Sequence, residues 1–302
     1  MKKVLKWLGI ILGGLVGLIL LALVGVYFMS ESRLNKTYNV QPERVTIPTD
    51  AAAVAEGKRL FATRGCMDCH KENGAGGDFI DDPLLGRINA SNLTAGQGGV
   101  GGAFTDGDWV RAIRHGIDSS GKPLWVMPSE EFNGINDTDL GALIAYIKSL
   151  PPVDQEIAAN SLGPLGRVLL VTDQIPVLPA EKINHEAPRP VAVEPGVTKE
   201  YGAYLAQTCS GCHGATLSGG PIPGVPAEPP YPANLTPEAE TGLGKWTEQD
   251  FLVAIREGKR PDGSSLDPKQ MPWPNFAQMS DEEISALWLY LQSVPAKPYG
   301  QR

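Results

Sequence analysis

One pentapeptide pattern occurs twice in this chain of 302 residues, and it contains all four cysteines. Residues 66–70 read CMDCH and residues 209–213 read CSGCH, so a histidine directly follows each pair of cysteines. Two cysteines separated by two residues form a redox disulfide, half of a zinc site or, where histidine comes next, the attachment site of a c-type haem. The duplicated pattern therefore points to one of these three kinds of chemistry.

The three interpretations require different surroundings. A zinc site needs a second pair of ligands nearby, whereas the two cysteine pairs lie 143 residues apart, and His115 and His185 have no counterpart in the repeat. A thioredoxin-like disulfide needs a βαβ unit, and the sequence shows no such pattern. A haem gives the histidine a role, because its imidazole binds the iron while both cysteine sulfurs bond to the macrocycle.

We therefore predict two covalently bound haem c groups. The predicted attachment and iron-binding residues are Cys66, Cys69 and His70 for the first haem, and Cys209, Cys212 and His213 for the second.

Two methionines are candidates for the opposite side of each iron. Haems that transfer electrons fill this position with a protein ligand, often methionine, whereas catalytic haems leave it open. Met127 and Met271 follow their histidines by 57 and 58 residues, and each is followed by proline. Core packing is the usual role of a single methionine, but a packing position tolerates leucine in one copy and a ligand position does not. We predict that Met127 and Met271 are the second axial ligands.

The repeat extends beyond the pentapeptides, at offsets of 142 to 144 residues. Residues 90–94 (ASNLT) match 232–236 (PANLT), and the AIR sequence at 112–114 recurs at 254–256. A repeat maintained over this length indicates a duplicated domain.

Helix signals recur at the same places in both copies, including N-cap residues at the start and glycine or proline after the end. We expect helices in three equivalent pairs of segments: 51–63 with 198–208, 105–116 with 247–258, and 136–150 with 280–294. Neither half shows a convincing run of alternating strands. Each half is predicted to be a small, loop-rich, all-α domain.

The amino-terminal segment predicts a membrane span. Lys2, Lys3 and Lys6 precede an uncharged, apolar run at 7–30, which is long enough at helical rise to cross a bilayer. A cleaved signal peptide is the alternative, but its apolar region is usually about 7 to 15 residues and ends in a small-residue cleavage site. Because lysines favour the cytoplasmic side, the rest of the chain is expected on the other side of the membrane.

These patterns divide the chain into five parts. A transmembrane anchor at 1–30 is followed by an extended tether at 31–50, a first domain at 51–152, a proline-rich connection at 153–194 and a second domain at 195–302. The predicted fold is all-α, with two tandem domains behind one N-terminal transmembrane helix.

Three features outside the repeat also give expectations. The apolar residues 168–171 (VLLV) are expected to pack between the two halves. His115 ends an arginine-rich helix and His185 lies in the connection, and both are interpreted as solvated surface residues.

The formal net charge of −8 argues against nucleic acid as a partner. Nucleic-acid binders gain affinity by neutralising phosphates with clustered lysine and arginine. A redox protein fits the charge and the predicted haems better.

With its two CxxCH motifs, two Asn-Leu-Thr segments and two Met-Pro pairs, the sequence resembles the class I cytochrome c superfamily. Within it, the chain is similar to the membrane-anchored, multi-haem cytochrome c subunits of periplasmic dehydrogenases. The resemblance covers about 51–152 and 195–298. It implies two tandem class I cytochrome c domains of short helices around each haem, with histidine and methionine as axial ligands.

The resemblance also implies a function and a location. We expect a dihaem cytochrome c on the periplasmic side of the bacterial cytoplasmic membrane, held by a single span. It would transfer single electrons between a respiratory donor, either a dehydrogenase or a quinol-oxidising complex, and a terminal acceptor such as an oxidase. Both partners are expected to be integral membrane complexes.

Two other functions have different requirements. A dihaem peroxidase or a thiosulfate-oxidising cytochrome needs an iron that is open or held by a displaceable ligand, and two equivalent Met-Pro positions argue against this. A subunit whose haems only stabilise a larger complex needs no turnover, and the sequence leaves this possibility open.

Overall fold

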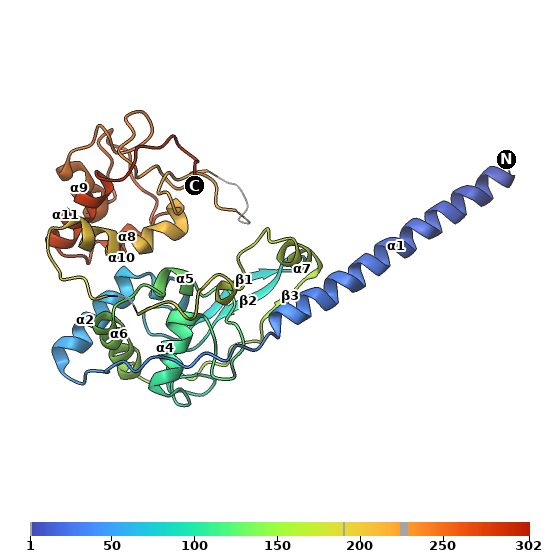
Figure 1. Cartoon of the computed structure of the whole chain (residues 1–302), viewed down its shortest axis with the longest axis horizontal. Coiled ribbons are helices and arrows are strands. Elements are labelled where there is room, and N and C mark those ends of the chain that lie inside the picture. The colour runs from blue at the N-terminus through green and yellow to red at the C-terminus, as the bar shows by residue number, and fades with distance from the viewer. Residues whose placement is uncertain (1, 190, 224–228) are drawn as a thin grey trace.

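The computed structural model describes residues 2–189, 191–223 and 229–302. A long helix, α1 (Lys2–Leu34), extends from a body made of two halves, and the amino terminus lies at its far tip (Figure 1). The first half, coloured light blue to green, lies beside the second half, coloured orange to red. Hydrogen bonds join the two halves directly, so they form one body.

The helices form equivalent sets in the two halves. Those of the first half are α2 (Ala51–Thr63), α3 (Cys66–His70), α4 (Asp106–His115), α5 (Ser129–Phe132) and α6 (Asp137–Ser149). Those of the second half are α8 (Lys199–His213), α9 (Glu248–Glu257), α10 (Trp273–Phe276) and α11 (Asp281–Leu291). Between them lie α7 (Pro164–Val171) and the 3-10 helix η1 (Pro179–Glu181). The prediction of a mainly helical chain with two repeated halves is confirmed.

The middle helices α4 and α9 begin and end through the same local chemistry. Thr105 and Thr247 each form a capping box with the aspartate three residues later, which satisfies two backbone N–H groups at each helix start. Gly116 and Gly258 end the helices with a φ of +64°, where a side chain would be strained. The predicted starts and ends of these helices are confirmed.

Each half has its core between its first and last long helices, where α2 packs on α6 and α8 packs on α11. One glycine permits close contact in each pair. A Cβ on Gly57 would lie 2.0 Å from the carbonyl oxygen of Ala142, and a Cβ on Gly202 would lie 2.0 Å from that of Ala286. The same helix approach therefore occurs in both halves.

The first attachment motif has a short helix of its own, whereas the second motif continues α8. The glycine of the helix contact precedes the first cysteine by nine residues in the first half and by seven in the second. The additional residues are accommodated after α2 ends, where Gly65 takes a left-handed φ of +74° before α3 begins.

A small antiparallel sheet in the first half was not predicted. β1 (Gly77–Asp82) pairs with β2 (Gly86–Ala90), and β2 pairs with β3 (Ser161–Leu162). The strands are short, and the third comes from far along the chain, beyond α6. Local alternation of side chains therefore gives little sign of this sheet.

The apolar part of the connection packs beside α1. Leu170 is buried with Leu34, Ile88 and Leu162 in a small apolar cluster, and α7 contacts α1. The expectation that residues 168–171 fill the space between the halves is therefore wrong. Because α7 follows β3 directly, pairing of β3 with β2 keeps this segment with the first half and at the end of α1.

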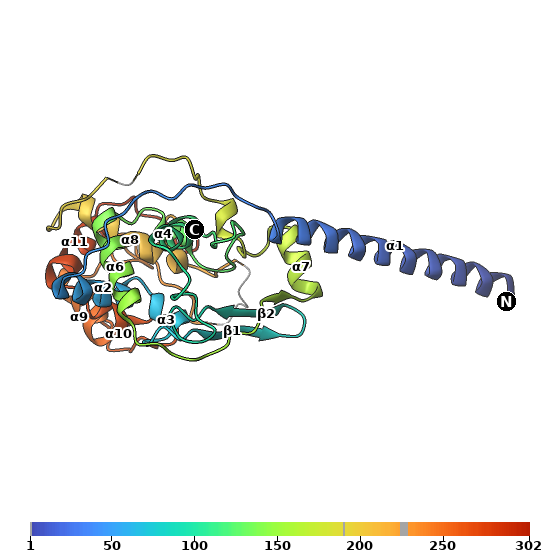
Figure 2. The same ribbon diagram turned by 90° about the horizontal axis from the view of Figure 1, so that it is seen from below.

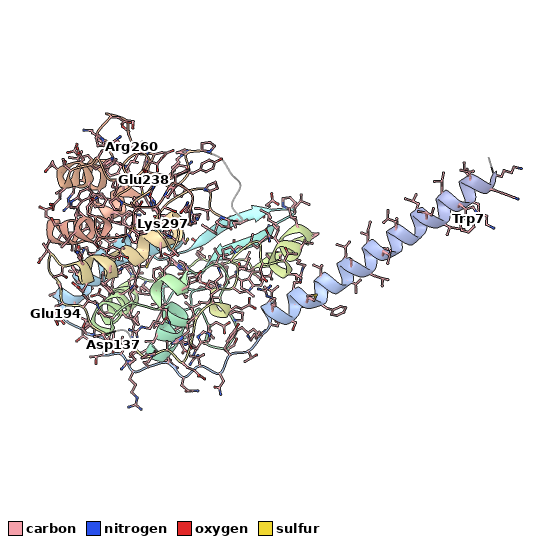
Figure 3. All side chains as sticks on the ribbon, turned by 45° about the horizontal axis from the view of Figure 1, so that its top comes forward. Trp7, Asp137, Glu194, Glu238, Arg260 and Lys297 are labelled. Carbon is pink, nitrogen blue, oxygen red and sulfur yellow. The ribbon has the colours of Figure 1, made fainter. Side chains whose placement is uncertain are left out.

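Helix α1 is exposed along most of its length. It is the one helix in the described ranges that is long and apolar enough to span a membrane, and none of its most apolar window is buried in the body. Side chains such as Trp7 project away from it on all sides (Figure 3). After α1 ends, the chain runs along the first half without helix or strand as far as residue 50 (Figure 2), and Val45 and Ile47 pack on the core.

His115 and His185 lie together. Nδ1 of His115 is 3.1 Å from Nδ1 of His185, whose Nε2 donates to the carbonyl oxygen of Ala180 at 3.0 Å. His115 is only 3% exposed and His185 is half-buried. Their interpretation as solvated residues is wrong, because the connection folds back over the end of α4 and brings His185 against His115.

Candidate functional site

Equivalent hydrogen bonds fix the two histidines of the repeated motif. Nδ1 of His70 lies 2.9 Å from the carbonyl oxygen of Ser91, and Nδ1 of His213 lies 2.7 Å from that of Ala233. A carbonyl oxygen only accepts, so Nδ1 carries the proton in each ring and Nε2 keeps its lone pair. A histidine that binds a metal is held in this way, with its second nitrogen donating to a fixed acceptor.

Both imidazoles are buried at the base of their halves. Burial lowers the pKa of His70 and of His213 below its ordinary value, against the smaller opposing effect of the hydrogen bond to the carbonyl. Each ring is therefore neutral at neutral pH. The neutral imidazole is the form that binds a metal ion.

The carbonyl groups that hold the histidines belong to the two Asn-Leu-Thr segments. Oδ1 of Asn92 accepts from the backbone N–H and the hydroxyl of Thr94, while its Nδ2 donates to the carbonyl oxygen of Val153 at 2.8 Å. Asn234 makes the same contacts in the second half, where Nδ2 donates to Lys297 at 2.8 Å. Each buried asparagine thus clamps its loop to the segment that follows the last helix of its half.

Sequence reasoning found these asparagines in the repeat but gave them no role. Their acceptors, on Val153 and Lys297, lie about sixty residues further along the chain. The recurrence of Asn-Leu-Thr at equal distances from the histidines was the available signal.

The two methionines lie on turns with the same backbone geometry. The backbone N–H of Ser129 donates to the carbonyl oxygen of Met127 at 2.7 Å, and that of Trp273 donates to Met271 at 2.6 Å. The proline after each methionine has φ and ψ of −77° and 56° in the first half and −75° and 54° in the second. Both turns are inverse γ-turns, and they lead into the short helices α5 and α10.

Each methionine shares a core with the cysteines of its own half. Cys66 and Met127 both pack against the core of the first half, and Cys209 and Met271 both pack against that of the second. All four side chains are half-buried. Attachment motif and methionine turn thus border one core in each half, as the ligand prediction requires.

The cysteine thiols are protonated in this environment. Burial raises the pKa of Cys66 and of Cys209 to about 12. A redox disulfide relies on an accessible thiolate with a lowered pKa, which argues against thioredoxin-like chemistry. Within the described ranges, no group of three or more histidine, cysteine, aspartate or glutamate residues could hold a metal ion, so the zinc interpretation lacks a ligand set.

Comparison with known proteins matches both halves to one family. The family model described as cytochrome c covers residues 54–151 and 200–295, one copy in each half. The chain belongs to the cytochrome c family. Two such domains, together with the similarity to a dihaem cytochrome reported below, establish that this cytochrome c binds two covalently attached haem c groups.

Relatives of this cytochrome c fall into two kinds. A fructose dehydrogenase cytochrome subunit from Gluconobacter japonicus is 29% identical over 283 residues, which are 83% of this chain and 55% of the relative. The cytochrome c subunit of an alcohol dehydrogenase (quinone) from Gluconobacter oxydans is 26% identical over 83% of this chain and 57% of the relative. A dihaem cytochrome c-type protein from Cereibacter sphaeroides is 25% identical over 91% of this chain and 97% of the relative. This chain therefore spans about half the length of the dehydrogenase subunits and nearly all of the dihaem cytochrome.

The residues of both halves fit haem c. Each half offers a pair of thiols, a neutral imidazole with a free Nε2 and a thioether on a fixed turn. In addition, the buried indole N–H groups of Trp109 and Trp273 have no hydrogen-bond partner within the described residues. The carboxylates of haem c are acceptors of the kind that such buried donors lack.

Proposed function

We propose that this cytochrome c is a membrane-tethered, dihaem electron carrier in which both irons have histidine and methionine as axial ligands. The residues that hold the first haem are Cys66, Cys69, His70 and Met127, and those that hold the second are Cys209, Cys212, His213 and Met271.

One observation carries this proposal: the local geometry of both ligands occurs twice. Each histidine donates through Nδ1 to a carbonyl of an Asn-Leu-Thr segment, and each methionine opens the same inverse γ-turn. A catalytic haem requires an accessible iron on one side. A pair of identical methionine turns instead supports two permanently six-coordinate irons.

Haem c, when bound, supplies the reversible exchange of one electron at its iron. The protein residues keep the coordination the same in both oxidation states. The hydrogen bond at Nδ1 fixes the ring of each histidine, and the soft thioether of each methionine favours the reduced iron. Since no ligand has to leave or arrive, little rearrangement accompanies electron transfer.

The location follows from α1. Its apolar, exposed surface suits lipid, and Lys2, Lys3 and Lys6 at its start favour the cytoplasmic side. The body with both haems then lies on the periplasmic side of the cytoplasmic membrane. The tether keeps the carrier at high effective concentration near integral membrane complexes.

For the redox partners, the names of the relatives give the direction. Relatives named as cytochrome subunits of fructose, alcohol and gluconate dehydrogenases support a respiratory donor, either a dehydrogenase or a quinol-oxidising complex. The electron then leaves to a terminal acceptor such as an oxidase. Purification from native membranes with identification of the proteins that accompany the chain tests both assignments.

Replacing the methionines tests the ligand assignment. Met127→Leu should abolish the native reduction potential and the methionine-to-iron absorption band of the first haem only, and Met271→Leu should do so for the second. Met279→Leu is the matched control, because Met279 is buried in the core without a counterpart in the first half. Unchanged spectra and potentials in both ligand variants would refute the assignment.

Turnover separates a carrier from a structural subunit. Stopped-flow mixing of the purified protein with reduced donor and then with oxidised acceptor should reduce and reoxidise both haems. Haems that stay in one state in the presence of copurified partners would support a purely structural role.

A further inference from the structure

The two attachment motifs meet where the halves contact each other. Asn275 of α10, four residues after Met271, donates from Nδ2 to Oδ1 of Asp68 at 2.6 Å. In the other direction, Glu131 of α5 lies over Gly211, where a Cβ would be 2.0 Å from Oε1 of Glu131. Asp68 and Gly211 occupy the same position in the two pentapeptides, and Glu131 and Asn275 lie at the same distance from their methionines. Each methionine turn therefore leads into a helix that covers the attachment loop of the other half.

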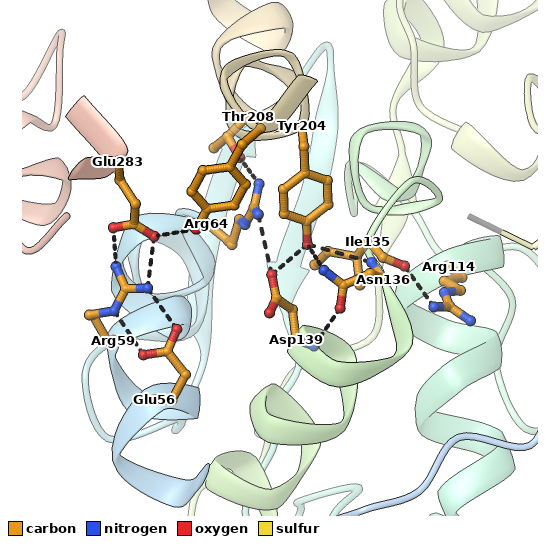
Figure 4. Close-up of polar contacts among 11 residues, drawn as sticks. Glu56, Arg59, Arg64, Arg114, Ile135, Asn136, Asp139, Tyr204, Thr208 and Glu283 are labelled. Carbon is orange, nitrogen blue, oxygen red and sulfur yellow. Dashed lines mark hydrogen bonds and ion pairs between the residues drawn. The ribbon is translucent and has the colours of Figure 1, made fainter. Parts of the chain in front are cut away.

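A second set of reciprocal contacts lies beside the first (Figure 4). Arg59 of α2 donates to both carboxylate oxygens of Glu283, in the first turn of α11, at 2.5 and 2.9 Å. Tyr204 of α8 donates its hydroxyl to Asp139, in the first turn of α6, at 2.5 Å. Asp139 and Glu283 are equivalent in the repeat. The contact thus resembles the isologous interface of a two-fold dimer, although one chain forms both sides.

We call this contact the seam. Its residues from the first half are Arg59, Arg64, Asp68, Glu131 and Asp139, and those from the second half are Tyr204, Gly211, Asn275 and Glu283.

Arg64 acts on both motifs from within the seam. Its side chain is 5% exposed, Nη1 donates to the hydroxyl of Thr208 at 3.1 Å, and the guanidinium lies 4.6 Å from the centre of the Tyr204 ring. Burial raises the pKa of Cys66 and of Cys209, and the charge of Arg64 opposes this effect at both thiols. One guanidinium is thus close to the first cysteine of each motif.

We propose that the seam joins the two haem sites into one relay, so that an electron accepted in one half passes to the other half within the chain. This inference rests on the proposed dihaem function. In each transfer one iron changes from Fe(II) to Fe(III) while the other changes from Fe(III) to Fe(II), and no proton or further reactant takes part. Glu131, Asn275 and Arg59 are positioning residues, because they hold the attachment loops against each other.

The argument depends on distance. The rate of electron tunnelling falls steeply with the separation of donor and acceptor, so a relay needs a short separation that persists. Domains joined only by a long connection sample many separations. The paired contacts of Arg59 with Glu283 and of Tyr204 with Asp139 instead fix the halves in one arrangement, with the two cysteine motifs at the contact.

The test measures electron transfer between the haems of the full-length holoprotein in lipid nanodiscs. A laser flash with a photoreductant delivers one electron, and haem absorbance follows its redistribution. Arg59→Glu opens the seam, because it sets a carboxylate against Glu283 and Glu56 without altering a predicted ligand. Lys259→Glu makes the same change of charge on the exposed surface of the second half and is the matched control.

The relay predicts a first-order redistribution phase, independent of protein concentration, in the wild type and in Lys259→Glu. Arg59→Glu should slow this phase by about 100-fold, as loss of positioning does in other reactions, while the spectrum of each haem stays unchanged. The double variant Glu131→Ala/Asn275→Ala removes the contacts over both attachment loops and provides the same comparison should Arg59→Glu not fold.

Two results would overturn the relay. One is the absence of a first-order phase in the wild type, and the other is an unchanged rate in every folded seam variant. Failure of the proposed dihaem function has a different signature, since the mass and absorption spectrum of the starting protein would then lack two six-coordinate haems.

Discussion

His70 and His213 depend on residues that do not belong to the haem motifs. The carbonyl groups that orient them lie next to Asn92 and Asn234, and each asparagine holds its loop through donors and acceptors that are buried. A buried donor that loses its partner costs more than the hydrogen bond itself contributes. At this scale, one amide side chain controls the position of an imidazole twenty residues away.

Replacement of Asn234 tests this dependence. Asn234→Ala leaves the backbone N–H of Thr236 and the carbonyl oxygen of Lys297 without partners, so the free energy of unfolding should fall by about 2 kcal/mol. The potential of the second haem should shift while that of the first stays constant. Asn92→Ala should give the mirror-image result. Chemical denaturation and redox titration measure both effects, and equal shifts at the two haems in either variant would contradict the clamp.

Glu131 predicts a pH dependence of stability. Burial, with a smaller contribution from Glu130, raises the pKa of Glu131 from 4.5 to about 8. The folded protein therefore keeps a proton that the unfolded chain releases near pH 4.5, and the free energy of unfolding falls as pH rises from 4.5 to 8. Glu131→Gln should remove this contribution, so its stability relative to the wild type should increase between pH 5 and pH 8.

Urea denaturation at both pH values measures the difference. Glu240→Gln, at an exposed position, is the control and should follow the wild type. A constant difference between Glu131→Gln and the wild type from pH 5 to 8 would rule out a raised pKa at this residue.

At the scale of elements, the features that the sequence predicted are the local ones. The capping boxes at Thr105 and Thr247 and the glycines that end α4 and α9 depend on residues within a few positions of each other. The sheet, the place of α7 and the burial of His115 depend on contacts between distant segments, such as β2 with β3 or His115 with His185. Periodicity and spacing carry no record of such partners.

The candidate site was predictable to the extent that it is repeated. Duplication singled out Met127 and Met271 among six methionines, and the structure gives both the same turn. The charge pairs of the seam were not predictable, because Arg59 has no arginine counterpart in the second half, and its partner Glu283 also serves as a helix cap. A residue with two roles shows only its local role in the sequence.

The glycine contact between α8 and α11 predicts a large effect of a small change. A Cβ on Gly202 would lie 2.0 Å from the carbonyl oxygen of Ala286 and 2.6 Å from Cβ of Tyr290, so the helices would have to separate. Gly202→Ala should lower the free energy of unfolding by about 2 to 3 kcal/mol. Gly102→Ala is the control, since its nearest neighbour would be 3.7 Å away. Equal stability of both variants in chemical denaturation would show that α8 and α11 can separate without cost.

At the scale of the molecule, α1 is fastened to the body. Arg33 donates to Glu181 and to the carbonyl oxygen of Leu170 and also pairs with Asp173 at 2.9 Å. Arg167 of α7 donates to the hydroxyl of Ser30 at 2.7 Å. These contacts connect the last turns of α1 to α7 and η1, so the helix and the first half share one orientation.

Arg33→Ala should loosen this connection. Hydrogen–deuterium exchange of the full-length protein in nanodiscs should become faster in α7 and in the last turn of α1, and should stay unchanged in α9. Arg87→Ala, which removes an exposed pair with Asp81 in the same half, is the control. Exchange that is identical in Arg33→Ala and Arg87→Ala would mean that Arg33 does not hold the helix.

Fastening of α1 has a kinetic consequence for a carrier anchored as proposed. A protein on a long leash sweeps out a hemisphere above the bilayer and can visit several complexes from one spot. This cytochrome must instead drift laterally with its helix, and it presents the same side to every complex that it encounters. Its turnover should therefore depend on membrane viscosity and on the crowding of complexes in the plane of the bilayer.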